Sequence, residues 1–130
     1  DDVAHELRIT LSAKHEGRKV EPAEPGGRPW EYDHWKVVLK RPGTPNLQTQ
    51  FRAGTGHGGE APSVASVLSS LILDADCGDK SFEEFCSELG YDEDSRKAHK
   101  IWKACRLIAP RIHRFLGSDY EAVAEAASGY

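Results

Sequence analysis

The stretch Ser95–Ser118, SRKAHKIWKACRLIAPRIHRFLGS, decides the fold of the second half of this chain. It holds seven Lys and Arg residues and no Asp or Glu. On a helical wheel its apolar residues share one arc and most of its basic residues lie opposite, which predicts an amphipathic helix over residues 95–116. Because the apolar arc continues past Pro110, we expect a kink near Ala109 rather than a break. The arc comprises Ala98, Ile101, Trp102, Cys105, Ile108, Ile112 and Phe115, and the predicted basic face comprises Arg96, Lys100, Lys103, Arg111 and Arg114.

Further helices are predicted on both sides of this stretch. Pro62 suits a first helical position, and apolar residues from Val64 to Ala75 recur at helical spacing. A second helix starts at a Ser-x-x-Glu capping box and ends near Gly90. A short Ala-rich helix follows the long one. The expected N-terminal caps are Ser81 with Glu84, then Asp92 or Asp94 for the long helix, and Ser118 with Glu121 for the last.

The first half of the chain has the period of β-strands. Apolar and polar residues alternate over Leu7–Ala13, which predicts a half-buried strand. Residues 35–40 and 47–52 alternate in the same way, and the short turn Pro42–Pro45 between them predicts an antiparallel hairpin. The segment Glu16–Pro29 has three prolines and three glycines and is expected to be a loop.

These elements predict an α+β fold, with a small antiparallel sheet from the N-terminal half packed against three to four helices from the C-terminal half. A length of 130 residues fits a single domain spanning residues 1–130. One core is expected to join sheet and helices. Its predicted members are Trp35, Val37, Leu39 and Phe51 from the strands, and Leu68, Leu71, Phe85, Ile101, Trp102 and Cys105 from the helices.

Composition bears on where the protein works. No apolar run approaches the roughly 18–20 residues of a membrane span, and Asp1–Val3 does not look like the start of a signal peptide. The absence of Met indicates that residue 1 is not the native start. Three cysteines without a close pair argue against a disulfide framework and favour a reducing cytoplasm. Cys86 and Cys105 lie on apolar helix faces, so we expect both to be buried.

Several patterns suggest chemistry, and none meets its requirements. Gly54–Gly59 matches the G-x-G-x-x-G phosphate motif, but the strand before it is half polar and Glu60–Pro62 separates it from the helix. Asp74–Asp79 resembles a calcium loop, yet Phe85 stands where a bidentate Glu belongs. The six histidines lack metal-site spacing, and acidic neighbours would raise the pKa of Cys77. We therefore expect no catalytic residue, no metal site and no cofactor.

Acidic residues gather immediately before the basic stretch. From Asp74 to Asp94 there are nine acidic residues and one Lys. One interpretation makes the basic residues a binding face for phosphates or an acidic protein. The other has the acidic helix neutralise them internally, through surface ion pairs of about 0–1 kcal/mol each. The acidic residues, with Glu83, Glu84 and Glu88 as the candidate face, could instead mimic nucleic acid toward a basic partner.

Three stretches together resemble a known group of proteins. They are Trp35–Leu39, Pro62–Asp76, and Ser81–Asp92 running into Asp94–Ala98. Over roughly residues 32–117 the chain resembles a family of small proteins encoded by bacteriophages and prophages. The resemblance implies a bacterial host cytoplasm as the setting. It also implies a dispensable accessory function. By analogy, small phage proteins without catalytic motifs often bind a host machine and block it, as anti-CRISPR proteins do.

The leading hypothesis is thus a non-enzymatic, phage- or prophage-encoded binding protein. It would act as an anti-CRISPR or other anti-defence inhibitor by surface contacts with a host protein complex, without a membrane. An alternative is a nucleic-acid-binding accessory protein that uses the basic face of the 95–116 helix. A third possibility is a small enzyme or nucleotide binder that uses Gly54–Gly59.

Overall fold

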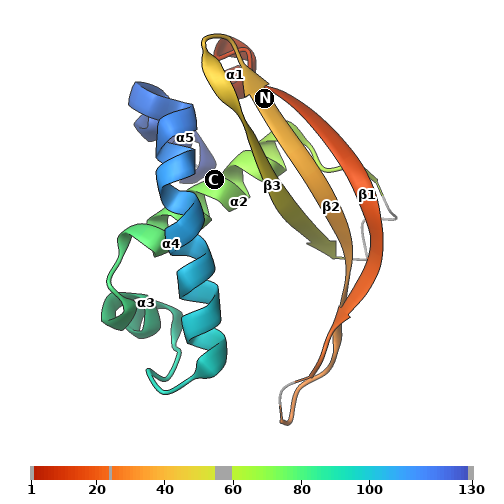
Figure 1. The fold of residues 1–130 in the computed structure, drawn as a ribbon, viewed down its shortest axis with the longest axis vertical. Helices are drawn as coiled ribbons and strands as arrows, with labels where there is room; N and C mark the ends of the chain where they lie inside the picture. Colours follow the sequence, from red (N-terminus) through yellow and green to blue (C-terminus); the bar gives the residue numbers. More distant parts are fainter. Residues whose placement is uncertain (1, 24, 55–59, 129–130) are drawn as a thin grey trace. The chain divides into compact units, whose positions relative to one another are not determined.

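The computed structural model describes residues 2–23, 25–54 and 60–128 and shows the predicted α+β architecture. A three-stranded antiparallel sheet of order β1-β2-β3 forms most of the first half, and helices form the second (Figure 1). The chain divides into two compact units, Asp1–Val67 and Leu68–Tyr130. The single domain with one shared core stays a prediction.

The first unit contains a short helix and the sheet. Helix α1 (Asp2–Glu6) precedes β1 (Thr10–Glu21), β2 (Trp30–Arg41) and β3 (Thr44–Gly54). The β2–β3 hairpin is antiparallel, as its short turn predicted. β1 also pairs antiparallel with β2 along its whole length.

The first strand differs from its prediction at both ends. Residues 7 and 8 form a turn instead of strand, because Arg8 has a left-handed φ of 57° and the Ile9 amide bonds back to the Ala4 carbonyl at 2.9 Å. At its other end β1 runs on to Glu21, into the predicted loop. A bulge between His15 and Gly17 lets the strand continue pairing with β2. Pairing with β2, which local sequence does not reveal, extends the strand.

The two faces of the sheet differ in polarity. One face carries the apolar residues predicted from the alternation, and Val37 and Leu39 are fully buried on it. The opposite face presents exposed polar and basic side chains, among them Lys14, Lys36 and Arg52.

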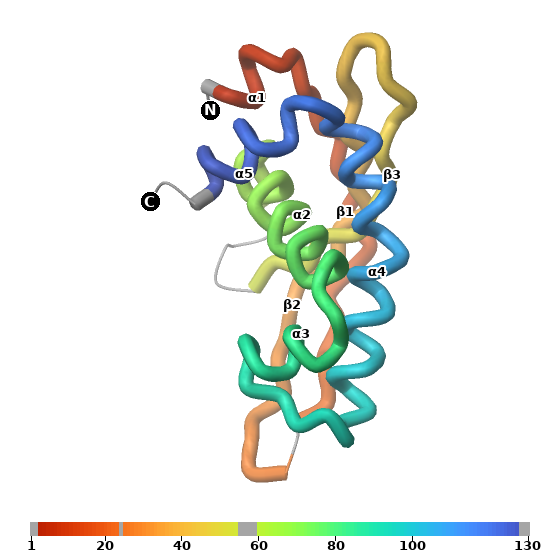
Figure 2. Tube along the Cα trace, turned by 90° about the vertical axis from the view of Figure 1, so that its left-hand side faces the viewer, coloured from red at the N-terminus to blue at the C-terminus, as the bar shows by residue number. Residues whose placement is uncertain are grey.

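The second unit is helical. Its elements are α2 (Val64–Asp79), which starts in the first unit, α3 (Phe82–Leu89), α4 (Arg96–Leu116), the 3-10 turn η2 (Gly117–Asp119) and α5 (Tyr120–Ser128). α3 lies beside the N-terminal part of α4 (Figure 2). The packing between them is apolar: Phe85, Cys86 and Ala98 are buried together, with Cys77, Phe82, Tyr91, Ile101 and Trp102 packed against them.

Helices α2 and α4 approach each other closely at Gly78. A Cβ atom at this position would lie 2.3 Å from the Cys105 carbonyl oxygen and 2.9 Å from Ala109 Cβ. Only a residue without a side chain fits such a crossing. The segment Asp74–Asp79, which resembled a calcium loop, is therefore the tightly packed end of α2.

The Ser81 cap of α3 forms as predicted, but Glu84 reaches back to the Ser81 hydroxyl and not to the Ser81 backbone N–H of a full capping box. Ser81 Oγ accepts a hydrogen bond from the Glu84 amide at 3.2 Å, and the Ser81 hydroxyl donates to Glu84 Oε1 at 3.2 Å. Gly90 ends the helix with a left-handed φ of 76°, and the Gly90 amide bonds to the Cys86 carbonyl.

Two other caps differ from prediction. α2 starts at Val64 and not at Pro62, because Ser63 Oγ accepts a hydrogen bond from the Ser66 amide at 3.1 Å. α4 is capped by Ser95, whose Oγ accepts from the Ala98 amide at 3.2 Å, and not by Asp92 or Asp94. The carboxylate of Asp92 instead accepts from the Asp94 amide at 3.2 Å and so stabilises the turn before the cap.

The C-terminal part of the chain confirms that Pro110 does not break the long helix, and it corrects the predicted cap of the last helix. α4 is one helix of 21 residues that includes Pro110, so the proline does not break it. Pro110 itself is exposed. Ser118 lies inside the 3-10 turn η2, and α5 begins at Tyr120 without the predicted cap. Within the described residues, no helix is long and apolar enough to cross a membrane.

Candidate binding surfaces

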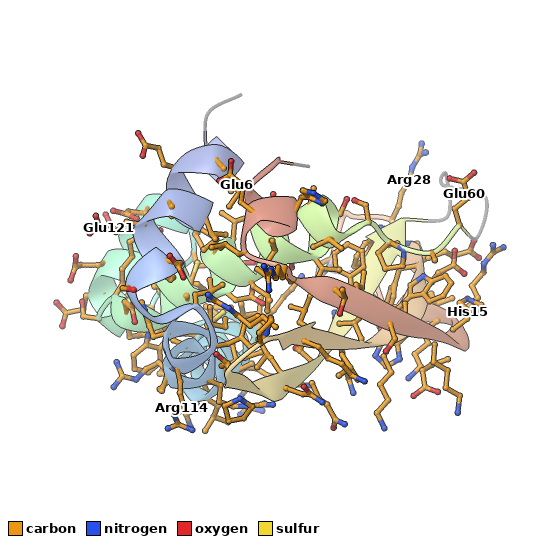
Figure 3. All side chains as sticks on the ribbon, turned by 90° about the horizontal axis from the view of Figure 1, so that it is seen from above. Glu6, His15, Arg28, Glu60, Arg114 and Glu121 are labelled. Carbon is orange, nitrogen blue, oxygen red and sulfur yellow. The ribbon has the colours of Figure 1, made fainter. Side chains whose placement is uncertain are left out.

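The predicted basic residues lie on the outside of α4. All five of them are exposed, and Figure 3 shows Arg114 pointing away from the helix into solvent. From the first to the last of them the helix rises about 27 Å. The α4 basic face is defined here as Arg96, Lys100, Lys103, Arg111 and Arg114 together with Leu107.

Leu107 stands at the centre of this face, and sequence reasoning missed it. Its side chain is 78 % exposed. The five basic residues lie four, seven or eleven positions from it, so all of them project from the same side of the helix. Ala104 and Pro110, three positions before and after it, are exposed beside it. The helical wheel contained the signal, because Leu107 is a large apolar residue on the basic side of the wheel.

Within the part of the chain that the structure describes, four of the five basic residues of this face make no ion pair that would neutralise them. Among the described residues, no ion pair joins Arg96, Lys100, Lys103 or Arg114 to a carboxylate. α3 packs on α4 through apolar residues, and Glu83, Glu84 and Glu88 of α3 are exposed.

The predicted acidic face is exposed but partly neutralised by Lys80. Glu83, Glu84 and Glu88 all lie on the surface of α3. The Lys80 ammonium lies 2.5 Å from Glu88 Oε2 and 2.7 Å from Asp76 Oδ2. Hydrogen bonds to Asp76 and then Glu88 raise the pKa of Lys80. The Lys80 carbonyl also accepts a hydrogen bond from Trp102 Nε1 at 3.0 Å, so this residue contacts three helices.

The thiols are poorly suited to nucleophilic chemistry. Cys86 and Cys105 are buried, as predicted, and Cys77 is partly buried. Burial is the main cause that raises the pKa of Cys77, with Asp76 and Asp74 adding to it and Lys80 opposing it. Burial, Asp74 and a hydrogen bond with Cys77 raise the pKa of Cys105 to about 12. Because the thiolate is the reactive form, these shifts disfavour attack by either sulfur near neutral pH.

Histidines that the sequence presented as scattered make specific contacts. His113 Nε2 lies 2.7 Å from Asp79 Oδ2, and the His99 ring stacks on Phe82 at 3.9 Å between centroids. Within the ranges that the structure describes, no three His, Cys, Asp or Glu side chains gather in a way that would hold a metal.

A buried carboxylate on the apolar face of the sheet was also missed. Asp33 is 2 % exposed, and its Oδ1 lies 3.0 Å from His15 Nε2 and 3.7 Å from Arg18 Nε. Its Oδ2 is buried and has no hydrogen-bond partner among the described residues. The register places Arg18 opposite Asp33 and His15 opposite Trp35. This pairing follows from the bulge, which the sequence did not indicate.

The other face of the sheet gathers basic and aromatic side chains. The polar sheet face is defined here as the set that alternates with the buried apolar residues along the three strands. It includes Lys14, Gly17, Lys19 and Glu21 of β1, Trp30, Tyr32, His34, Lys36 and Lys40 of β2, and Gln50 and Arg52 of β3, with the half-buried Val38 between Lys36 and Lys40. Its period-two spacing was readable in the sequence, but which residues face each other depends on the register.

The glycine-rich motif is only partly visible. Gly54 ends β3, while residues 55–59 lie outside the described residues.

Comparison with known proteins gives no significant match: no family model, no curated protein and no solved structure matches this chain. The proposals that follow therefore stand on the chain's own residues, and the resemblance to phage proteins stays a prediction.

Proposed function

We propose that this chain is a non-enzymatic binding protein whose α4 basic face docks on an acidic surface of a protein partner. The observation that supports this most is Leu107, a 78 % exposed leucine framed by basic residues on one side of a single helix. An apolar centre within a polar rim is the usual anatomy of a protein–protein interface.

The exposed apolar residues among the basic ones favour a protein over a nucleic-acid backbone as the ligand of this face. Lys and Arg alone suffice to bind phosphates. Leu107, with the exposed Ala104 and Pro110 beside it, gains from binding only if a partner buries it against an apolar surface of its own. No aromatic side chain lies among the basic residues to stack a base, because Trp102 is part of the apolar cluster and carries the Arg106 guanidinium over its ring at 5.1 Å.

The partner's chemistry follows from the shape of a helix face. An exposed helix side about 27 Å long fits a groove that receives the apolar residue at its floor. Carboxylates along both rims of that groove would meet the Lys and Arg side chains. Such charge complementarity speeds association and makes binding weaken with salt.

The narrower proposal concerns the biological setting. The resemblance over roughly residues 32–117 supports a phage or prophage protein in the cytoplasm of a bacterial host. There it would inhibit a host defence complex, a CRISPR effector among the candidates, by occupying an acidic docking surface.

The test compares variants of the whole chain as baits. Bacterial lysate, with and without nuclease treatment, is passed over the immobilised wild type, Leu107→Ala, Lys100→Glu/Lys103→Glu, and Leu73→Ala. Leu73 is the matched control, because it is a 65 % exposed leucine on α2, outside the α4 basic face.

We expect a protein that the wild type and Leu73→Ala retain and that the other two variants do not. Repurified, that protein should bind the wild type directly, with an affinity about tenfold higher than for Leu107→Ala. Capture that survives Leu107→Ala would contradict the proposal. Capture that disappears with nuclease would instead favour the nucleic-acid alternative for this face.

A further inference from the structure

We propose that the polar sheet face is a second binding site, which takes single-stranded nucleic acid. It lies in the first unit and uses none of the residues of the α4 basic face.

The register of the sheet places basic side chains opposite each other, an arrangement that lowers the stability of the fold. Lys14 on β1 stands directly opposite Lys36 on β2. Like charges at directly opposed positions destabilise a sheet, so this pair is unfavourable unless an anion lies over it. Three more basic side chains continue the row on the same face, Lys19, Lys40 and Arg52.

Glu21, which supplies a carboxylate to this face, pairs with Arg52 and not with the lysines. The Arg52 guanidinium lies over the Tyr32 ring at 5.0 Å and pairs with Glu21 at 3.8 Å. Among the described residues, no ion pair joins Lys14, Lys36 or Lys40 to an acidic side chain. The charge of these lysines is thus available to phosphates.

Aromatic rings continue the same face beyond the lysines. Trp30 stacks on Tyr32 with 4.8 Å between ring centroids, and the Trp30 side chain is 45 % exposed. An exposed indole supported from behind by a second ring presents a flat surface on which a base can stack. Duplex DNA keeps its bases stacked inside, so a stacking platform beside a basic row favours single strands.

A buried polar atom lies between the lysines and the aromatic rings. His34 is 7 % exposed, and its Nε2 lies 2.9 Å from Gln50 Oε1. Its Nδ1 is buried without a hydrogen-bond partner among the described residues. Across the strand pair stands Gly17, and a side chain there would meet no atom within 4 Å. The strand position opposite His34 is therefore free of any side chain, which leaves room on the surface of the sheet for a ligand.

The dimensions suit a short oligonucleotide. Ten residue steps separate Trp30 from Lys40 along β2, which corresponds to about 33 Å. Small single-strand-binding domains take about 4–16 nucleotides. The expected interactions are phosphates on the lysine row and one or two bases on the Trp30–Tyr32 pair.

The experiment measures fluorescence anisotropy of labelled single strands of about 12 nucleotides, DNA and RNA, and of the corresponding duplex, from about 50 to 200 mM salt. The whole chain is compared with Lys14→Glu, Trp30→Ala and the matched charge reversal Lys100→Glu on α4. Thermal melting of each variant is recorded in parallel.

Lys14→Glu should weaken single-strand binding about tenfold and lower the salt slope by about 0.7 for each phosphate that the variant no longer binds. Its melting temperature should stay level or rise, because a glutamate opposite Lys36 replaces a repulsion with an attraction. Weaker binding then cannot be ascribed to unfolding. Trp30→Ala should weaken binding about fivefold or more with the salt slope unchanged, since stacking carries no charge. Lys100→Glu should bind as the wild type does.

Three outcomes would overturn the inference. They are no anisotropy change at about 50 mM salt, equal weakening by Lys100→Glu and Lys14→Glu, and a preference for the duplex over the single strand. A preference between RNA and DNA strands would support the inference and would also identify the sugar that the site accepts.

Discussion

At the scale of single residues, Asp74 links the packing of α2 to pH. Burial raises its pKa from 3.8 to about 6, so the folded state holds this proton more tightly than the unfolded chain does. The carboxyl group therefore favours folding below about pH 4, and that contribution is lost as the pH rises to about 6. Above this range the fold carries a half-buried carboxylate that the unfolded chain would solvate freely.

Asp74→Asn should remove this penalty. We expect the variant to be more stable than the wild type by about 1–2 kcal/mol near pH 7.5, with partial exposure keeping the gain below the full value of two pKa units. Near pH 3.5 the two proteins should be equally stable. Urea titrations across this pH range measure the difference, and Glu83→Gln on the surface of α3 serves as the control. A difference that does not change with pH would contradict the assignment.

Gly78 shows how one absent side chain sets a helix crossing. In an exposed helix, Gly→Ala stabilises by up to about 1 kcal/mol. Here the new methyl group would lie 2.3 Å from the Cys105 carbonyl oxygen, so we expect Gly78→Ala to destabilise by about 1–3 kcal/mol. Chemical denaturation measures the sign. The double variant Gly78→Ala/Ala109→Gly should stay destabilised, because the second change leaves the backbone clash in place.

At the scale of secondary-structure elements, α4 depends on its Ser95 cap. Ser95→Ala should lower the free energy of unfolding by about 1 kcal/mol, because the Ala98 amide loses its acceptor. Ser95→Asp, which restores an acceptor, should recover most of the loss, whereas Asp94→Ala should have a smaller effect. If Asp94→Ala proves the costlier change in thermal melting, the cap assignment is wrong.

The helices were more predictable than the strands, for a physical reason. Capping residues and apolar residues four apart act within one turn, so α3 and the apolar arc of α4 could be predicted from local sequence. The length of β1 depends on its pairing with β2, and Lys14 and Lys19, five positions apart, share a face only because a bulge lies between them. Neither is encoded in the segment itself. Leu107, by contrast, could have been singled out on the helical wheel, and the structure adds that it and its neighbours on α4 are exposed.

At the scale of the whole molecule, the two proposed surfaces belong to different units of the chain. Their charges are separate too: residues 1–67 hold nine acidic and nine Lys or Arg residues, and residues 68–130 hold twelve and eight. The basic face of α4 is therefore local to a unit that is acidic overall. This explains why a net charge of −4 gives no indication of either surface.

Because the surfaces share no residue, their variants should act independently. Lys14→Glu should weaken oligonucleotide binding and leave protein capture intact, while Leu107→Ala should do the reverse. The double variant should show both defects without any additional loss of stability, as expected for surfaces that share no residue. Anisotropy and bait retention measured on the same four proteins decide this. Impairment of both activities in either single variant would mean that the two ligands share one surface.

The crossing at Gly78 also has an evolutionary consequence. A backbone contact, unlike a side-chain contact, cannot be preserved by compensating substitutions in the partner helix. Lineages that descend from the same ancestor can replace most of α2 and α4 and still must inherit a glycine here, with a small residue at the position of Ala109. Remote homologues whose remaining sequence no longer aligns could thus be identified by one signature. It is a glycine at the end of one helix that faces a small residue in the middle of a later, longer helix.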